Sequence, residues 1–120
     1  RTFRPLHSTA GGKAILSTWP TEAVAEYVDH NGLEAVTDRT ITSPDALFDE
    51  LERIREDGYA TNREETVEGL GAVSVPIENP TDGVIGALGV SGPINRVGDG
   101  EYAGLLLGAK KEIELNIRLL

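Results

Sequence analysis

The chain has 120 residues, a formal net charge of −9, and neither cysteine nor methionine. Its length predicts one domain with its own core, and the lack of cysteine excludes disulfides, thiolate metal sites and thiol nucleophiles. The excess of negative charge argues against direct nucleic-acid binding by these residues, and no apolar run approaches the roughly 20 residues of a membrane span.

The first predicted helix covers residues 8–17. Its start is marked by hydroxyl residues, because Ser8 or Thr9 can cap the free amides of a first helical turn. It should stop before Trp19-Pro20, since a residue ahead of proline avoids helical backbone. The small residues Gly11 and Gly12 leave room for another group to approach this helix start.

Two further helices are predicted before the strands begin. Thr21 is expected to cap one that ends at Gly32. The other begins at Ser43-Pro44, where a capping hydroxyl precedes a proline in the first helical position, and it ends at Gly58.

Short strands are predicted over 59–62, 72–77 and 84–91, with a turn over 79–83 between the last two. In the second strand, alternation places Val73, Val75 and Ile77 on one face and Ala72, Ser74 and Pro76 on the other. In the third, Val84, Leu88 and Val90 share one face with Gly86, and the opposite face carries Ile85, Ala87, Gly89 and Ser91.

A long amphipathic helix closes the chain, with apolar residues at steps of three and four: Tyr102, Leu106, Ala109, Ile113, Ile117 and Leu120. These elements predict an α+β fold in which helices pack on an antiparallel sheet. Because two or three strands are too few for a stable sheet, either earlier strands precede this chain or another copy covers the sheet edges.

Gly11-Gly12-Lys13 does not fit a phosphate-binding loop. That motif needs a glycine where His7 stands and a hydroxyl residue where Ala14 stands. Two alternatives remain for this helix start: it binds a carboxylate at its free amides, or it packs closely with no ligand.

Enzymatic and metal sites are also poorly supported. Ser91 lies in a G-x-S-x sequence, but Pro93 replaces the final glycine of a nucleophile elbow, so hydrogen bonding to a ligand is the favoured role of Ser91. His7 is expected to form a hydrogen bond ahead of the first helix, and His30 to be exposed. The acidic residues around Glu50 and Glu64-Glu65 are expected to form solvated faces, so no metal site is predicted.

A series of motifs in fixed order resembles the effector-binding domain of IclR-family transcription regulators over nearly the whole chain: Leu6-His7-Ser8-Thr9-Ala10-Gly11-Gly12-Lys13-Ala14, Arg39-Thr40-Ile41-Thr42, Asp57-Gly58-Tyr59-Ala60, Glu64-Glu65, Gly69-Leu70 and Ser91-Gly92-Pro93. The resemblance implies a sensor fold like those of GAF and PAS domains, with first strands ahead of Arg1. Residues 1–120 would then be the C-terminal part of a single effector-binding domain, and the missing methionine agrees with Arg1 beginning a fragment.

The resemblance also implies a ligand pocket formed by Thr9, Ala10, Gly11, Asn62, Leu70, Ala72, Gly89 and Ser91. The amides near Ala10 and Gly11 would hold a ligand carboxylate, with Ser91 as a further donor. This chain departs from the family's pattern at three positions, with Asn62 where aspartate is common, Ala72 where cysteine is frequent and Gly89 in place of a serine. We therefore expect an extra donor at Asn62, a donor gained by Gly89→Ser, and a preference for bulkier or less hydroxylated acids.

The predicted function is sensing of a small organic acid by a cytoplasmic, homo-oligomeric regulator, a dimer or tetramer that contacts DNA only through an N-terminal winged helix-turn-helix. No enzymatic activity, cofactor or membrane partner is expected. The alternatives are an oligomerisation module with a vestigial pocket and, less favoured, a small carboxylate-handling enzyme. The acidic excess has two readings: a surface kept for solubility, or adaptation to a high-salt cytoplasm.

Overall fold

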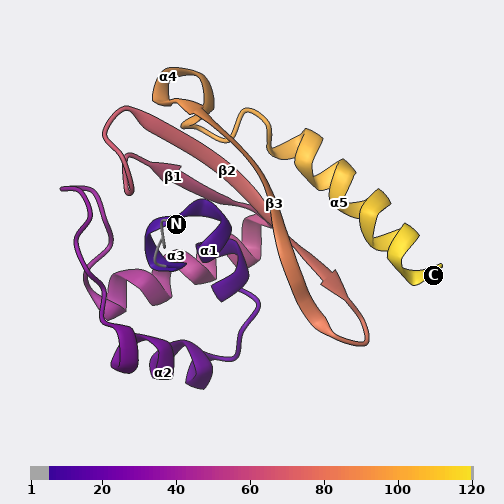
Figure 1. The fold of residues 1–120 in the computed structure, drawn as a ribbon, viewed down its shortest axis with the longest axis horizontal. Helices are drawn as coiled ribbons and strands as arrows, with labels where there is room; N and C mark the ends of the chain where they lie inside the picture. The colour runs from indigo at the N-terminus through magenta and orange to yellow at the C-terminus, as the bar shows by residue number, and fades with distance from the viewer. Residues whose placement is uncertain (1–5, 120) are drawn as a thin grey trace, which may run out of the picture.

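The computed structural model describes residues 6–119 and shows a three-stranded antiparallel sheet with helices on both faces (Figure 1). The strands β1, β2 and β3 are neighbours in that order and span Ala60–Arg63, Leu70–Asn79 and Gly83–Pro93. The helices α1 to α5 span Ala10–Leu16, Thr21–Asn31, Pro44–Asp57, Ile94–Val97 and Ala103–Arg118. This arrangement confirms the predicted fold class.

Two hydrophobic clusters hold the layers together. On one side of the sheet, α1, α2 and α3 enclose a cluster that includes Leu16, Val24, Leu47 and Leu51, all fully buried. On the other side, α5 covers the face of β2 that carries Val73 and Val75. The alternation predicted for β2 and β3 is confirmed where Leu88 and Val90 also pack into this second cluster. It fails at Val84, because the register of the two strands shifts after Ile77 and pairs Val84 with Glu78, and Val84 does not join the cluster.

The start of α1 is built from very small residues. A 3-10 turn, η1 (Leu6–Ser8), leads into Thr9, whose hydroxyl accepts a hydrogen bond of 2.9 Å from the amide of Gly12. A Cβ at position 12 would lie only 2.2 Å from the carbonyl oxygen of Leu6 and 2.6 Å from Thr9 Oγ1. Only glycine therefore fits at this position. The helix is shorter than the predicted range, because Ser8 belongs to the turn, Thr9 is the N-cap and Ser17 is the C-cap.

The other helix boundaries follow the sequence with one exception. Ser43 caps α3, and Gly58 ends it with a φ of 86°, a left-handed conformation that favours glycine. Thr21 was expected to cap α2 and does not: Pro20 is the N-cap and Thr21 is the first helical residue. The carbonyl of Pro20 accepts from the amides of Ala23 and Val24, so the first helical turn begins directly after the proline.

Smaller differences occur near the strands and the C-terminus. β1 begins one residue later than predicted, β2 and β3 extend beyond their predicted ends, and the short helix α4 was not anticipated. Tyr102 precedes α5 as its N-cap residue, and Leu120, the last position of the predicted apolar pattern, lies outside the described residues.

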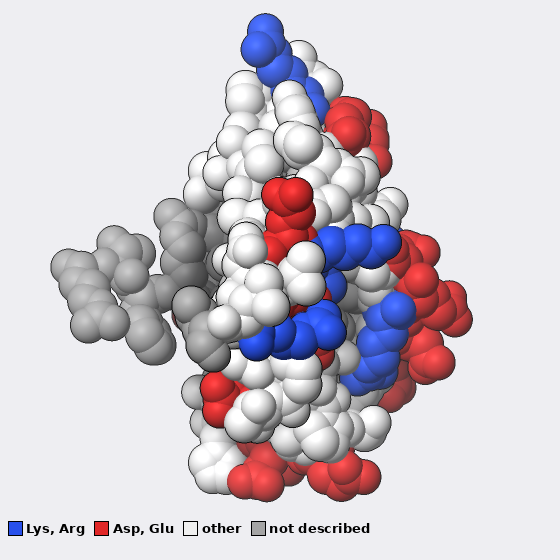
Figure 2. All heavy atoms as spheres, turned by 90° about the vertical axis from the view of Figure 1, so that its right-hand side faces the viewer, with Lys and Arg blue, Asp and Glu red and all other residues white. Residues whose placement is uncertain are grey.

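No helix within residues 6–119 is both long and apolar enough to cross a membrane. Figure 2 shows one side of the molecule, on which Lys and Arg side chains lie among Asp and Glu side chains. On that side the charges are mixed, with no continuous basic surface of the kind that binds a phosphate backbone.

Candidate functional site

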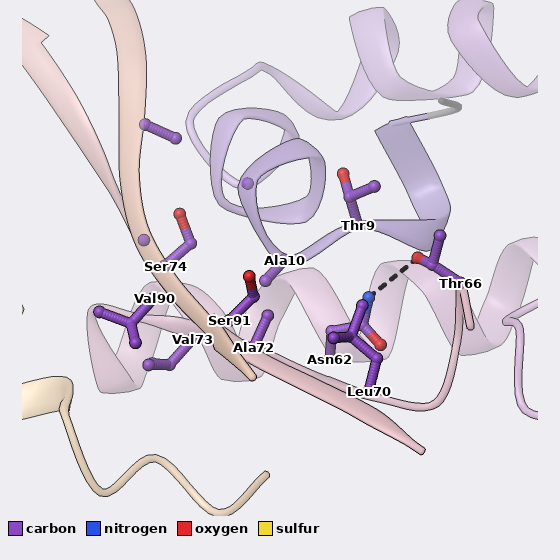
Figure 3. Close-up of a pocket in the computed structure, with 13 residues that line it drawn as sticks. Thr9, Ala10, Asn62, Thr66, Leu70, Ala72, Val73, Ser74, Val90 and Ser91 are labelled. Atoms are coloured by element: carbon purple, nitrogen blue, oxygen red, sulfur yellow. Dashed lines mark hydrogen bonds between the residues drawn. The ribbon is translucent and has the colours of Figure 1, made fainter. Parts of the chain in front are cut away.

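A cavity of ≈ 400 Å³ lies between the N-terminal end of α1 and the facing side of β2 and β3 (Figure 3). The structure brings all eight of the predicted pocket residues to this one cavity. Its lining consists of Thr9, Ala10, Gly11, Asn62, Thr66, Leu70, Ala72, Val73, Ser74, Ala87, Gly89, Val90 and Ser91.

Strand register explains why these residues meet. β2 and β3 are antiparallel and pair Ala72 with Ser91 and Ser74 with Gly89, so small residues of both strands lie on the face toward α1. Val73 and Val90 border the cavity but pack their side chains with the cluster under α5. In Figure 3 these two side chains point away from α1. The cavity is open where Gly89 and Ser91 are exposed.

The two glycines of the lining differ in the space around them. A Cβ at Gly11 would meet Ala87 Cβ at 3.7 Å and Ser74 Oγ at 3.8 Å, which are ordinary contacts. A Cβ at Gly89 would lie 2.8 Å from the carbonyl oxygen of Val73. The expectation that Gly89→Ser simply adds a donor is therefore wrong, because the strand backbone would have to shift first.

Asn62 connects β1 to the segment before α1 and to the loop after β1 through three side-chain hydrogen bonds. Its Nδ2 donates to the carbonyl of Ser8 at 2.8 Å and to Thr66 Oγ1 at 3.0 Å, while its Oδ1 accepts from the amide of Glu65 at 2.8 Å. Both side-chain donors of this residue are thus used within the protein. The extra donor expected at Asn62 is not available to a ligand, although the residue does line the cavity.

Other polar groups of the lining remain available. Within the described residues, the side chain of Ser91 makes no hydrogen bond, and Figure 3 shows its hydroxyl on the side of Ala10. Ala10 and Gly11 are the first residues of α1, so their amides have no helical carbonyl one turn earlier to bond to. These groups can donate to an acceptor placed between α1 and β3.

A buried ion-pair network lies behind this wall. Lys13 is fully buried, and its Nζ is 2.8 Å from both Glu65 Oε1 and Glu50 Oε2. The side chains of both glutamates are 11% exposed, so the prediction of solvated acidic faces is wrong at these two positions. Thr40 adds a 2.6 Å hydrogen bond to the carbonyl of Glu65. The network fixes the segment between β1 and β2 against α1 and α3.

Opposing effects act on Glu50. Burial would raise the pKa of its carboxyl, but attraction to Lys13 and hydrogen bonds from Lys13 and Arg53 outweigh burial and hold that pKa below its ordinary value. Glu50 is therefore a carboxylate at neutral pH and keeps its ion pair with Lys13.

Neither histidine lies in the cavity lining. The prediction for His7 is confirmed, since its Nε2 is 2.9 Å from the carbonyl oxygen of Glu34, and the prediction of an exposed His30 is confirmed as well. Within residues 6–119, no group of three or more His, Asp or Glu side chains is placed to hold a metal ion.

Sequence reasoning missed Thr66, Ser74 and Ala87, together with the two valines that border the cavity. The strand alternation contained a signal for two of them, because Ser74 shares a face with Ala72, and Ala87 shares a face with Gly89 and Ser91. Thr66 follows the buried Glu65 in a loop, where no periodic pattern could have indicated it.

The chain matches known regulators along most of its length. Residues 2–114 match the family described as bacterial transcriptional regulator IclR C-terminal. The chain is 34% identical to the probable HTH-type transcriptional regulator ArcR of Halobacterium salinarum, covering 97% of this chain and 46% of that protein. It is 36% identical to the HTH-type transcriptional regulator KdgR of Escherichia coli, covering 91% of this chain and 43% of that protein. The chain thus spans under half the length of these relatives.

Solved structures show the same fold. The IclR structure from Thermotoga maritima superposes with a TM-score of 0.86 at 35% identity, over 92% of this chain and 46% of that one. A second structure is the inducer-binding domain of a double mutant of the PobR transcription factor from Acinetobacter, solved in complex with 3-hydroxybenzoic acid. It superposes with a TM-score of 0.85 at 30% identity, over 92% of this chain and 66% of that one. Given the match over residues 2–114, this chain belongs to the IclR family, in the C-terminal effector-binding region of its bacterial transcription regulators.

Proposed function

We propose that this chain senses a small carboxylate effector for a DNA-binding transcription regulator. The observation that carries the proposal is the cavity at the start of α1, where the Ser91 hydroxyl and the amides of Ala10 and Gly11 can donate to one acceptor. A carboxylate is a common biological group that accepts several such bonds. The PobR domain, which resembles this chain, was solved with an aromatic acid.

The remaining features of the regulator belong to the same proposal. As the C-terminal part of an effector-binding domain, residues 1–120 leave DNA binding to a winged helix-turn-helix outside them, and the regulator acts in the cytoplasm as a dimer or tetramer. The relatives are named as transcriptional regulators, which favours sensing over catalysis. An enzyme would need a tuned acid or base beside its ligand, and no titratable side chain lines the described cavity.

Calorimetry with a panel of oxo-acids, aliphatic acids and aromatic acids tests this proposal. At least one acid should bind, and Ser91→Ala should weaken it by about tenfold or more, since a hydrogen bond to a charged group contributes roughly 1.5–3 kcal/mol. Ser43→Ala is the matched control, because it removes a hydroxyl at the start of α3, outside the cavity. If no acid binds, the cavity is vestigial; equal binding by Ser91→Ala and the parent contradicts the assigned pocket.

A further inference from the structure

Most polar side chains of the cavity already form hydrogen bonds with other groups of the protein. Five of them line it: Thr9, Asn62, Thr66, Ser74 and Ser91. Thr66 donates to the carbonyl of Ser8 and accepts from Asn62, whose own donors are both used. The Ser74 hydroxyl donates to the carbonyl of Leu88 at 3.0 Å.

Two hydroxyl hydrogens remain for a ligand. Thr9 uses its oxygen to accept from the amide of Gly12, which leaves the hydrogen of the hydroxyl unused by that bond. Ser91 makes no side-chain hydrogen bond to any part of the chain that the structure describes. These two hydrogens suit a group that only accepts, such as a carboxylate. Once they are used by that carboxylate, the side chains of the lining offer few partners to further polar groups of a ligand.

The rest of the lining is apolar. Ala10, Leu70, Ala72 and Ala87 contribute methyl or larger apolar groups, and Gly11 and Gly89 contribute only backbone. None of the lining residues carries a charge. A ligand hydroxyl turned toward this wall loses its hydrogen bonds to water and gains no hydrogen bond to the protein. A second carboxylate of a ligand finds no positively charged side chain in the lining.

We infer that the cavity selects acids with a single carboxylate and an apolar body, and discriminates against polyhydroxylated acids and dicarboxylic acids of the same length. This inference rests on the proposed function and narrows its ligand class. Each hydroxyl left without a partner against the wall should weaken binding by about tenfold or more.

Three six-carbon acids form the test: hexanoate, gluconate and adipate, titrated calorimetrically into the full chain. Hexanoate should bind at least about tenfold more tightly than either of the others. Gluconate or adipate binding as tightly as hexanoate overturns the inference but leaves carboxylate sensing intact. If none of the three binds, hexanoate included, the inference is wrong, and the wider acid panel then decides the proposed function separately.

A substitution in the wall gives a second readout. Ala72 pairs with Ser91 across β2 and β3, so Ala72→Ser adds a hydroxyl to the apolar wall of the cavity. Because this hydroxyl can bond to a hydroxyl of gluconate, the ratio of the affinities for hexanoate and gluconate should fall several-fold. Ala46→Ser makes the same change at an exposed position of α3 and should leave the ratio unchanged. An unchanged ratio in a folded Ala72→Ser variant contradicts the assigned apolar wall.

Discussion

Lys13 and Glu65 stand 52 positions apart, yet Lys13 Nζ donates to both carboxylate oxygens of Glu65, at 2.8 and 3.0 Å. Glu65 directly precedes Thr66 in the cavity wall, and Lys13 follows the glycines at the start of α1. This ion pair therefore connects two walls of the cavity from behind. Its removal should affect the fold and the cavity together.

Lys13→Met should destabilise the protein by about 3 kcal/mol or more, because it leaves two nearly buried carboxylates without their shared cation. Equilibrium unfolding in urea measures the change. Lys111→Met is the matched control, since Lys111 is exposed on α5. Similar stability of the two variants would show that the ion pair is not the main contact of this segment.

Glu50 makes stability depend on pH in a defined direction. Its folded pKa is lowered, so the stability it contributes is present above the unfolded value, near 4.5, and is lost as pH falls through the lower folded pKa. Unfolding free energies measured from pH 6 downward should show a smaller acid-induced loss in Glu50→Gln than in the parent. Glu22→Gln, at an exposed position of α2, should retain the parent's profile. Identical profiles in the Glu50→Gln variant and the parent would contradict the assigned linkage.

The glycines of the cavity predict opposite results for the same substitution. Gly11→Ala should fold normally and gain up to about 1 kcal/mol, because the methyl fits and alanine favours helices. It should also reduce the affinity of the bulkiest acids, since the methyl occupies the cavity. Gly89→Ala should lose about 1–3 kcal/mol, because its Cβ lies 2.8 Å from a backbone oxygen. Thermal unfolding of both variants checks the contrast, which fails if Gly89→Ala is as stable as the parent.

Salt should stabilise the protein if its acidic excess is an adaptation to brine. Its net charge of −9 disfavours the compact state, and this repulsion acts over about 10 Å at 0.1 M salt but only about 3 Å at 1 M. The melting temperature should therefore rise between low and molar potassium chloride. A melting temperature that stays flat or falls over this range would leave solubility as the explanation of the acidic surface. The assignment of the fold would not change.

Local signals were sufficient for most of the fold. The ends of α3 were predictable from Ser43 and Gly58, because capping and left-handed backbone are local requirements. Strand alternation likewise placed Val73 and Ala72 on opposite faces of β2. The roles of Glu65 and Asn62 could not be obtained in this way. A glutamate that meets a buried lysine 52 positions away has the same local sequence as an exposed one. The donors of Asn62 similarly depend on the carbonyl of Ser8, which only the tertiary fold brings near.

Gly11 and Gly12 are adjacent but differ in how freely they can change. Gly12 is fixed by its contact with Leu6 and Thr9, so replacement there disturbs the helix start itself. Gly11 faces the cavity with room for a methyl group. At the proposed ligand site, Gly11→Ala should therefore change ligand preference while the scaffold stays intact. In a regulator that senses its effector as proposed, a substitution at position 11 would change the inducer while the chain still folds.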